Sequence, residues 1–226
     1  EYAQVSHQID KDVERWVREA EKETLREITT SELNTTIKKL KKGKSTGPDN
    51  IPNEAIINTD ENTRNIMTRV FNNVANQQNM PDEWQEGTIS RLYKGKGKKG
   101  RVENERGITV ASNLGKVFER IVNNRAKITH AMTDAQAGGK EHRATMDHTI
   151  ILKDVINQQK AKRKPLYLIF LDVTKAYDKA WLNGLLHSLH ENGVRGKTWD
   201  IIQKLNHNLT ARIKTKDGLT RKIQIK

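Results

Sequence analysis

The sequence contains no cysteine, only 5% aromatic residues and no long apolar run. The absence of cysteine excludes disulfide bonds, thiolate zinc sites and cysteine nucleophiles, and it is typical of a reducing compartment. No stretch approaches the about 20 apolar residues of a membrane span, and the polar start is unlike a signal peptide. We therefore expect a soluble intracellular chain, and the start at Glu1 rather than at Met suggests a part of a longer protein.

Apolar residues are also scarce. Counted with glycine and without tyrosine they make up about 38% of the chain, against roughly 45–50% in ordinary globular proteins. The 226 residues allow one large domain or two small ones, and the low apolar content indicates an elongated, well-hydrated domain or an incomplete core.

Positive charge, in contrast, is abundant. There are 41 Lys and Arg against 28 Asp and Glu, which gives a net charge of +13 and an isoelectric point near 9.8. Such a surface favours a polyanion as the partner, and nucleic acid is the leading candidate. A lysine-rich protein with solvated basic faces stays the alternative. The seven histidines are scattered, and their closest pairs predict surface or core positions rather than a metal site.

Residues 166–171 form the longest apolar run, and Asp172 follows it directly. Aromatic and β-preferring residues in such a run predict a buried central strand. A carboxylate at the end of a buried strand suits a magnesium ligand. Asp is also a preferred helix N-cap, so these residues alone leave both roles for Asp172 open.

Apolar periodicity predicts helices over most of the chain. The expected helices cover residues 11–28, a segment that starts at a Thr29–Glu32 capping box and ends at Gly43, and residues 63–76, 114–122, 147–156, 182–189 and 199–205. Alternation predicts short strands at 88–93 and 106–110, and Asp217-Gly218 predicts the turn of a hairpin over 211–226. This mixture indicates an α+β fold.

Three irregular segments separate these elements. Two prolines and a glycine force a fixed turn in residues 44–52. Residues 94–101 place five positive charges among glycines, without the features of a phosphate-binding P-loop, and predict a mobile basic loop or a solvated tip. Residues 136–140 form a third break.

Six segments then follow one another in a specific order along residues 30–226. They are Lys44-Ser-Thr-Gly-Pro-Asp-Asn-Ile-Pro52; Trp84 with Leu92-Tyr93-Lys94 and Asn104-Glu-Arg106-Gly-Ile-Thr109; Leu114-Gly-Lys-Val-Phe-Glu-Arg-Ile121; Thr133-Asp-Ala-Gln136-Ala-Gly138; Arg143-Ala-Thr145-Met-Asp147; and Phe170-Leu-Asp172-Val-Thr-Lys-Ala-Tyr177-Asp178. Together they resemble the reverse transcriptases of non-LTR (LINE-type) retrotransposons and, more distantly, those of group II introns.

The sequence departs from this family's pattern at a few positions. Glu105 and Gly107 stand where the family usually has Tyr and Pro around Arg106, and Gly139 and Lys140 stand where it often has Phe-Arg. The family's later Gln-Gly segment and its hairpin with two aspartates are expected beyond Lys226.

The resemblance implies an RNA-directed DNA polymerase that uses two Mg²⁺ ions and deoxynucleoside triphosphates, with an RNA template and a DNA primer as partners. Asp172 is then the catalytic metal ligand. The nucleotide is expected at Lys94, Arg106, Val173, Thr174, Ala176 and Tyr177. The nucleic acid is expected at Gly47, Pro48, Ile51, Pro52, Gln136, Gly138 and Arg143.

The family also implies an organisation. We expect an N-terminal helical extension at 1–28, helix-rich fingers at 29–165, and the first part of a right-hand polymerase palm, an antiparallel sheet packed on helices, at 166–226. The location implied is the nucleus or a cytoplasmic ribonucleoprotein. One carboxylate cannot hold two magnesium ions, so this fragment alone is expected to be inactive.

Two alternatives remain. The first is a non-enzymatic, domesticated or degenerate reverse-transcriptase-like domain that only binds nucleic acid. The second is a phosphohydrolase built on Asp172, which is weakened because Thr174 replaces the second aspartate that such enzymes use.

Overall fold

A computed structural model describes residues 2–77, 79–126, 133, 135–140, 142–174, 176–177 and 179–225. These residues form nine α-helices, one short 3-10 helix and a five-stranded mixed sheet, which confirms the α+β class. The chain divides into two compact units, one made of Glu1–Lys127 with Leu182–Lys226 and the other of Ile128–Trp181. The division into fingers and palm stays a prediction.

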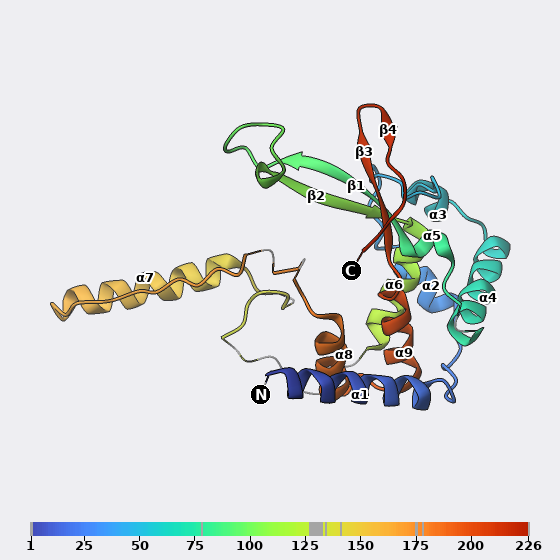
Figure 1. The fold of residues 1–226 in the computed structure, drawn as a ribbon, viewed down its shortest axis with the longest axis horizontal. Helices are drawn as coiled ribbons and strands as arrows, with labels where there is room; N and C mark the ends of the chain where they lie inside the picture. Colours follow the sequence, from blue (N-terminus) through green and yellow to red (C-terminus); the bar gives the residue numbers. More distant parts are fainter. Residues whose placement is uncertain are drawn as a thin grey trace. The chain divides into compact units, whose positions relative to one another are not determined.

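The first unit holds most of the helices. They are α1 (Tyr2–Ala20), α2 (Thr30–Ile37), α3 (Asn53–Ile57), α4 (Glu61–Gln77), α5 (Asp82–Gln85), α6 (Asn113–Arg125), α8 (Leu182–Glu191) and α9 (Gly196–Leu205). Helix α1 lies along α8 and α9 (Figure 1). The predicted capping box begins α2, because the Thr29 hydroxyl accepts from Glu32 N at 3.2 Å and Glu32 Oε2 accepts from Thr29 N at 2.9 Å.

The sheet is built on a long hairpin. β1 (Glu86–Tyr93) pairs antiparallel with β2 (Glu105–Ala111), and the short helix η1 (Val102–Asn104) lies in the connection between them. β3 (Thr210–Thr215) pairs parallel with the first half of β1 and antiparallel with β4 (Gly218–Leu219) and β5 (Ile223–Gln224). The sheet is therefore mixed rather than purely antiparallel, and the hairpin extends away from the helices (Figure 1).

Two apolar clusters form the core of the first unit. In the larger one Phe71, Trp84 and Phe118 pack their rings against each other with centroids 5.3–5.8 Å apart. In the smaller one Trp16 of α1 packs against Trp199 of α9 and other apolar residues of the first unit. The larger cluster holds the base of the hairpin against α6, since Trp84 directly precedes β1 and packs against Phe118 of α6.

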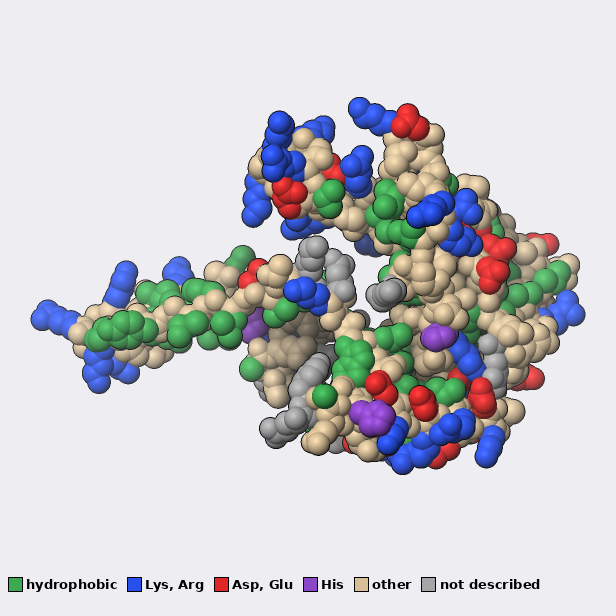
Figure 2. Space-filling view, in the orientation of Figure 1, with side chains coloured by type: hydrophobic (Ala, Val, Ile, Leu, Met, Phe, Trp, Pro, Cys, Tyr) green, Lys and Arg blue, Asp and Glu red, His purple; other side chains and the backbone are tan. Residues whose placement is uncertain are grey.

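The second unit contains helix α7 (Thr145–Ala161) and the extended residues that follow it. The predicted helix at 147–156 is confirmed, but none of its residues is buried in the described structure. Figure 2 shows hydrophobic side chains along this helix, in agreement with the exposure of Met146, Ile150 and Ile151.

The predicted buried strand at 166–171 is wrong. These residues are not in a strand, and Tyr167, Ile169 and Leu171 are 87%, 87% and 93% exposed. A strand needs a neighbour for its backbone hydrogen bonds, and no strand of the described residues pairs with this segment. The apolar run predicted burial, but burial depends on a partner that the run itself does not specify.

Two helix boundaries also differ from the predictions. The first helix covers Tyr2–Ala20 instead of 11–28, and α2 ends at Ile37 instead of continuing to Gly43. After α2 the backbone is held by other segments, because Asn53 Nδ2 donates to Lys41 O at 2.8 Å and Gly43 N donates to Glu54 Oε1 at 2.6 Å. These long-range contacts end the helix although Leu40 continues its apolar periodicity.

Candidate nucleic-acid interface

Residues 44–52 form a fixed turn in the first unit, as predicted. Asn50 N donates to Gly47 O at 3.0 Å, and Asn50 has a φ of 54°, in the left-handed region that glycine and asparagine favour. Pro48 and Pro52 restrict the backbone on both sides of Asn50. Asn is one of the few residues besides Gly that adopt this conformation at low cost.

This turn is attached to the junction between β2 and α6. The Ser112 hydroxyl donates to Asp49 Oδ2 at 2.5 Å and accepts from Gly115 N at 3.0 Å, so one side chain caps α6 and holds the turn. At Gly47 the approach is closer still, since an added Cβ would lie 2.5 Å from Ser112 N and 2.6 Å from Ala111 O. Only glycine fits this position without a backbone shift.

Asn113 adds a second attachment. Its buried side-chain amide donates to Ile51 O at 2.9 Å and to Ser45 O at 3.4 Å. Gly47, Pro48, Ile51 and Pro52 are thus held as one rigid element. The sequence analysis did not predict the roles of Ser112 and Asn113. For Ser112 a signal was available, because Ser is a preferred N-cap and stands immediately before an apolar-periodic helix.

The tip of the β1–β2 hairpin carries Lys94 and the basic loop. Lys94 Nζ donates to Glu103 O at 2.7 Å and Lys94 N donates to Asn104 O at 2.9 Å, so this residue closes the loop. The Tyr93 hydroxyl donates to Gly97 O at 2.5 Å and orders the near side of the loop. Figure 2 shows basic side chains gathered over this tip. The tip is exposed and positively charged, and its mobility stays a prediction.

Arg106 lies on the exposed face of the same hairpin. It is paired across the strands with Leu92, and Ile108 follows on the same face. Leu92 and Ile108 are 56% and 45% exposed. The two predicted fingers cations, Lys94 and Arg106, therefore both lie near the end of the hairpin that carries the basic tip.

Asp172 and its neighbours belong to the second unit. Val173, Thr174, Ala176 and Tyr177 are exposed like Asp172 itself, and the Tyr177 side chain is 96% exposed. The described residues contain no group of three His, Cys, Asp or Glu that could hold a metal ion. Asp172 therefore does not by itself form a magnesium site in this part of the chain. Asp178 and Asp134 lie outside the described residues.

The predicted template turn at Gln136 and Gly138 is also in the second unit. Gln136 N donates to Thr133 O at 3.0 Å and Gln136 Nε2 donates to Gly138 O at 3.2 Å. Arg143 follows this turn and is exposed, with its backbone N donating to Lys140 O at 3.3 Å. These contacts give the segment a local turn structure.

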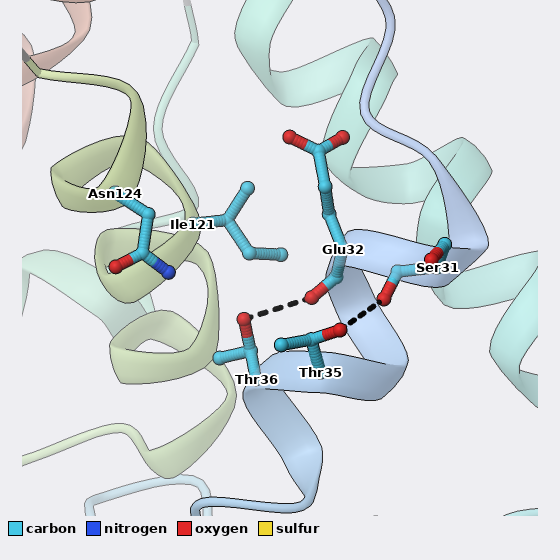
Figure 3. A pocket seen from close by; sticks show the side chains of 6 residues that line it. All are labelled: Ser31, Glu32, Thr35, Thr36, Ile121 and Asn124. Atoms are coloured by element: carbon cyan, nitrogen blue, oxygen red, sulfur yellow. Dashed lines mark hydrogen bonds between the residues drawn. The ribbon is translucent and has the colours of Figure 1, made fainter.

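A small cavity of about 140 Å³ between α2 and α6 offers no chemistry of its own (Figure 3). The Thr35 and Thr36 hydroxyls donate to carbonyls of their own helix, Ser31 O and Glu32 O, at 2.9 Å. The Glu32 carboxylate points away from them, and it accepts from Arg125 Nε at 2.8 Å and Nη2 at 2.7 Å. This double hydrogen bond is the main cause that lowers the pKa of Glu32 to about 2. The cavity is therefore a structural feature of the helix packing.

Comparison of the sequence with known protein families shows which family the chain belongs to. A profile of the family described as reverse transcriptase (RNA-dependent DNA polymerase) matches residues 96–221, which is more than half of the chain. The chain belongs to the reverse transcriptase family. The match includes part of the hairpin, Arg106, the turn at Gln136 and the segment around Asp172.

Individual relatives place this reverse transcriptase domain among those of non-LTR retrotransposons. A probable RNA-directed DNA polymerase from transposon BS of Drosophila melanogaster is 26% identical over 168 residues, which is 72% of this chain. The RNA-directed DNA polymerase from mobile element jockey of the same species is 27% identical over 167 residues, and a Pol polyprotein from type-1 retrotransposable element R2 of Popillia japonica is 29% identical over 133. The aligned region spans 18–19% of these relatives' own length.

The part of this reverse transcriptase domain that the structure describes has no helix both long and apolar enough to cross a membrane.

Proposed function

We propose that this chain is the part of an RNA-directed DNA polymerase that binds the RNA template, the DNA primer and the incoming deoxynucleotide. The observation that carries the proposal is the family match over residues 96–221, which includes Arg106 and Asp172. The net charge of +13 supports a nucleic-acid partner. The rigid turn at 47–52 and the basic hairpin tip offer surfaces for a strand.

In this proposal each group of residues has a separate role. Lys94 and Arg106 hold the triphosphate, because cations placed on the transferring phosphates are a common device in phosphoryl transfer. Tyr177 packs under the sugar, where its ring excludes a 2′-hydroxyl, and Val173, Thr174 and Ala176 face the phosphates. Gly47, Pro48, Ile51, Pro52, Gln136, Gly138 and Arg143 contact the template.

Asp172 is proposed as one carboxylate ligand of the magnesium site. In polymerases two such ions stabilise the attacking and leaving oxygens. The described residues do not supply the other ligands, so the proposal places those ligands in residues other than the described ones. We therefore expect the 226-residue chain to bind primer and template without extending the primer.

The test compares two proteins in an RNA-templated primer-extension assay. One is the 226-residue chain, and the other is a longer protein that carries the rest of the polymerase. We expect extension only by the longer protein, and we expect Asp172→Asn to abolish it. The matched control is Asp154→Asn, which removes an exposed carboxylate from α7 of the same unit and should leave extension unchanged.

The outcome also separates the second candidate function. A domesticated, non-enzymatic domain would bind nucleic acid in both proteins and extend the primer in neither. Full activity of the Asp172→Asn protein would refute the role given to Asp172. Extension by the 226-residue chain would refute the proposal that the remaining metal ligands are missing from it.

A further inference from the structure

A basic pocket of about 330 Å³ lies in the first unit, beside the turn at 47–52. Its lining comes from the segment after α2, from Asn53 of α3, from the end of β2 and from α6. Five of the lining residues are cations, and no acidic residue lines it. The cations are Lys39, Lys41, Lys44, Lys116 and Arg120.

Lys116 is half-buried and the other four cations are exposed, and their pairing differs from that of charged side chains in the interior of the unit. Arg125 is paired with Glu32, and Asp200 of α9 is paired with two lysines at 2.8–2.9 Å. None of the five pocket cations has a salt bridge within 4.0 Å among the described residues. Glu119 and Asp49 act electrostatically on the α6 side of the pocket but do not line it. The pocket lining therefore carries a net positive charge that these two carboxylates offset only in part.

Lys116 is positioned at the half-buried wall of the pocket. Its Nζ donates to Ala111 O at 2.9 Å and approaches Asn113 Oδ1 at 3.5 Å. An ammonium group has three donors, so one N–H remains for a ligand. Burial lowers the pKa of Lys116, and an anion in the pocket would oppose that effect. The cation is held in place before any ligand arrives.

The uncharged polar residues that line the pocket also suit an anionic ligand. Ser45 and Thr109 add hydroxyl groups, and the Asn113 amide that lines the pocket also fixes Ser45 and Ile51. Because the turn is attached to α6, Lys44 and Ser45 have a defined place relative to Lys116. Such preorganisation reduces the entropy that binding costs.

We propose that this pocket binds consecutive phosphodiester groups of a nucleic-acid strand. A phosphate monoester carries only about 1.5 to 2 negative charges, which is less than five cations can neutralise. Successive phosphodiesters along one strand supply one charge each and match a pocket whose cations come from two segments, the residues after α2 and helix α6. The proposal rests on nucleic-acid binding as the proposed function. It assigns part of that binding to the five pocket cations, which are separate from the residues proposed to contact the template.

The experiment measures how binding of a mixed-sequence single-stranded RNA oligomer to the 226-residue chain depends on salt. The variant K39Q/K41Q/K44Q removes three exposed lysines. The matched control K11Q/R18Q/K22Q removes three cations from α1 and from the residues that follow it, so both variants have the same net charge. Urea unfolding of both variants checks that they keep the wild-type fold.

For single strands each neutralised phosphate contributes about −0.7 to the slope of log affinity against log salt. We expect K39Q/K41Q/K44Q to reduce the slope by up to about 2 in magnitude, and the control to change it much less. Lys116→Gln, on the other wall, should reduce it by about 0.7. Equal changes in K39Q/K41Q/K44Q and in the control would overturn the proposal.

A second arm identifies the source of the phosphate. A fluorescent nucleoside triphosphate should bind the wild type and K39Q/K41Q/K44Q equally, because the proposed ligand is a strand. Selective loss of triphosphate binding in that variant, with RNA binding unchanged, would overturn the proposal and indicate a small phosphorylated ligand. If the wild type shows no salt-dependent RNA binding at all, the proposed function fails together with the pocket; if only the variant effect is missing, the pocket alone fails.

Discussion

The ion pair between Glu32 and Arg125 allows a quantitative prediction about stability. Arg125 lies at the end of α6, and it also donates to Arg26 O and Glu27 O, so it joins the segment before α2 to α6. The Glu32→Gln substitution removes the charge and keeps the size of the side chain. The ordinary pKa of 4.5 falls to about 2 in the folded protein.

This shift corresponds to about 3 kcal/mol, at 1.36 kcal/mol per pKa unit. The Glu32 side chain is 28% exposed, so solvent screening reduces the effect, and we expect a loss of about 1–2 kcal/mol in the free energy of unfolding. Because the folded pKa is the lower one, the stabilisation is complete above pH 4.5 and is lost as the pH falls towards 2.

The assay is urea unfolding followed by tryptophan fluorescence at several pH values. The difference between wild type and Glu32→Gln should be largest at neutral pH and should shrink below pH 4.5. Glu14→Gln is the matched control, since Glu14 is exposed on α1. A difference that stays constant with pH, or one no larger than that of Glu14→Gln, would refute the reasoning.

Three further predictions follow from single contacts and can be measured by the same unfolding assay. Gly47→Ala should cost about 1–3 kcal/mol because the new Cβ meets the backbone at Ser112, whereas Gly138→Ala, with no atom within 4 Å, should cost little. Asp200→Asn should cost about 3–5 kcal/mol, since it leaves two lysines near a buried position without their carboxylate; a smaller loss than Gly47→Ala would contradict this. Burial, with a smaller effect of the Arg195 charge, lowers the pKa of His190, so the folded state should lose stability as the pH falls below 6.5. His190→Phe should weaken that pH dependence, and an unchanged dependence would exclude His190 as its source.

Local patterns predicted the local elements well. The Thr29–Glu32 capping box and the alternation along 88–93 depend on neighbours in the sequence, and both are confirmed. The hairpin predicted from Asp217-Gly218 is also present, but its two turn residues are Lys216 and Asp217, because Gly218 already pairs with Thr215. The apolar periodicity at 63–76 also predicted α4 within a few residues.

Contacts between distant residues were not predictable in the same way. The parallel pairing of β1 with β3 needs two short strands to meet, and neither carries a signal for the other. The pocket cations come from separate segments, and a sequence does not show which cations will have no salt bridge in the folded chain. At 166–171 the apolar run described a preference for burial, but not whether a neighbour would be present.

The parallel pairing has a consequence for how the chain folds during synthesis. Gln85 Nε2, at the base of β1, donates to Lys204 O and His207 O, which lie 119 and 122 positions further along the chain. The first unit is thus discontinuous, with Ile128–Trp181 inserted between its halves. At about 5–20 residues per second, its earlier half waits roughly 5–20 s for the later one to be translated. During this interval one edge of β1 has no partner, and unpaired strand edges favour aggregation. Binding of a chaperone is therefore expected to matter most between the synthesis of β2 and that of β3.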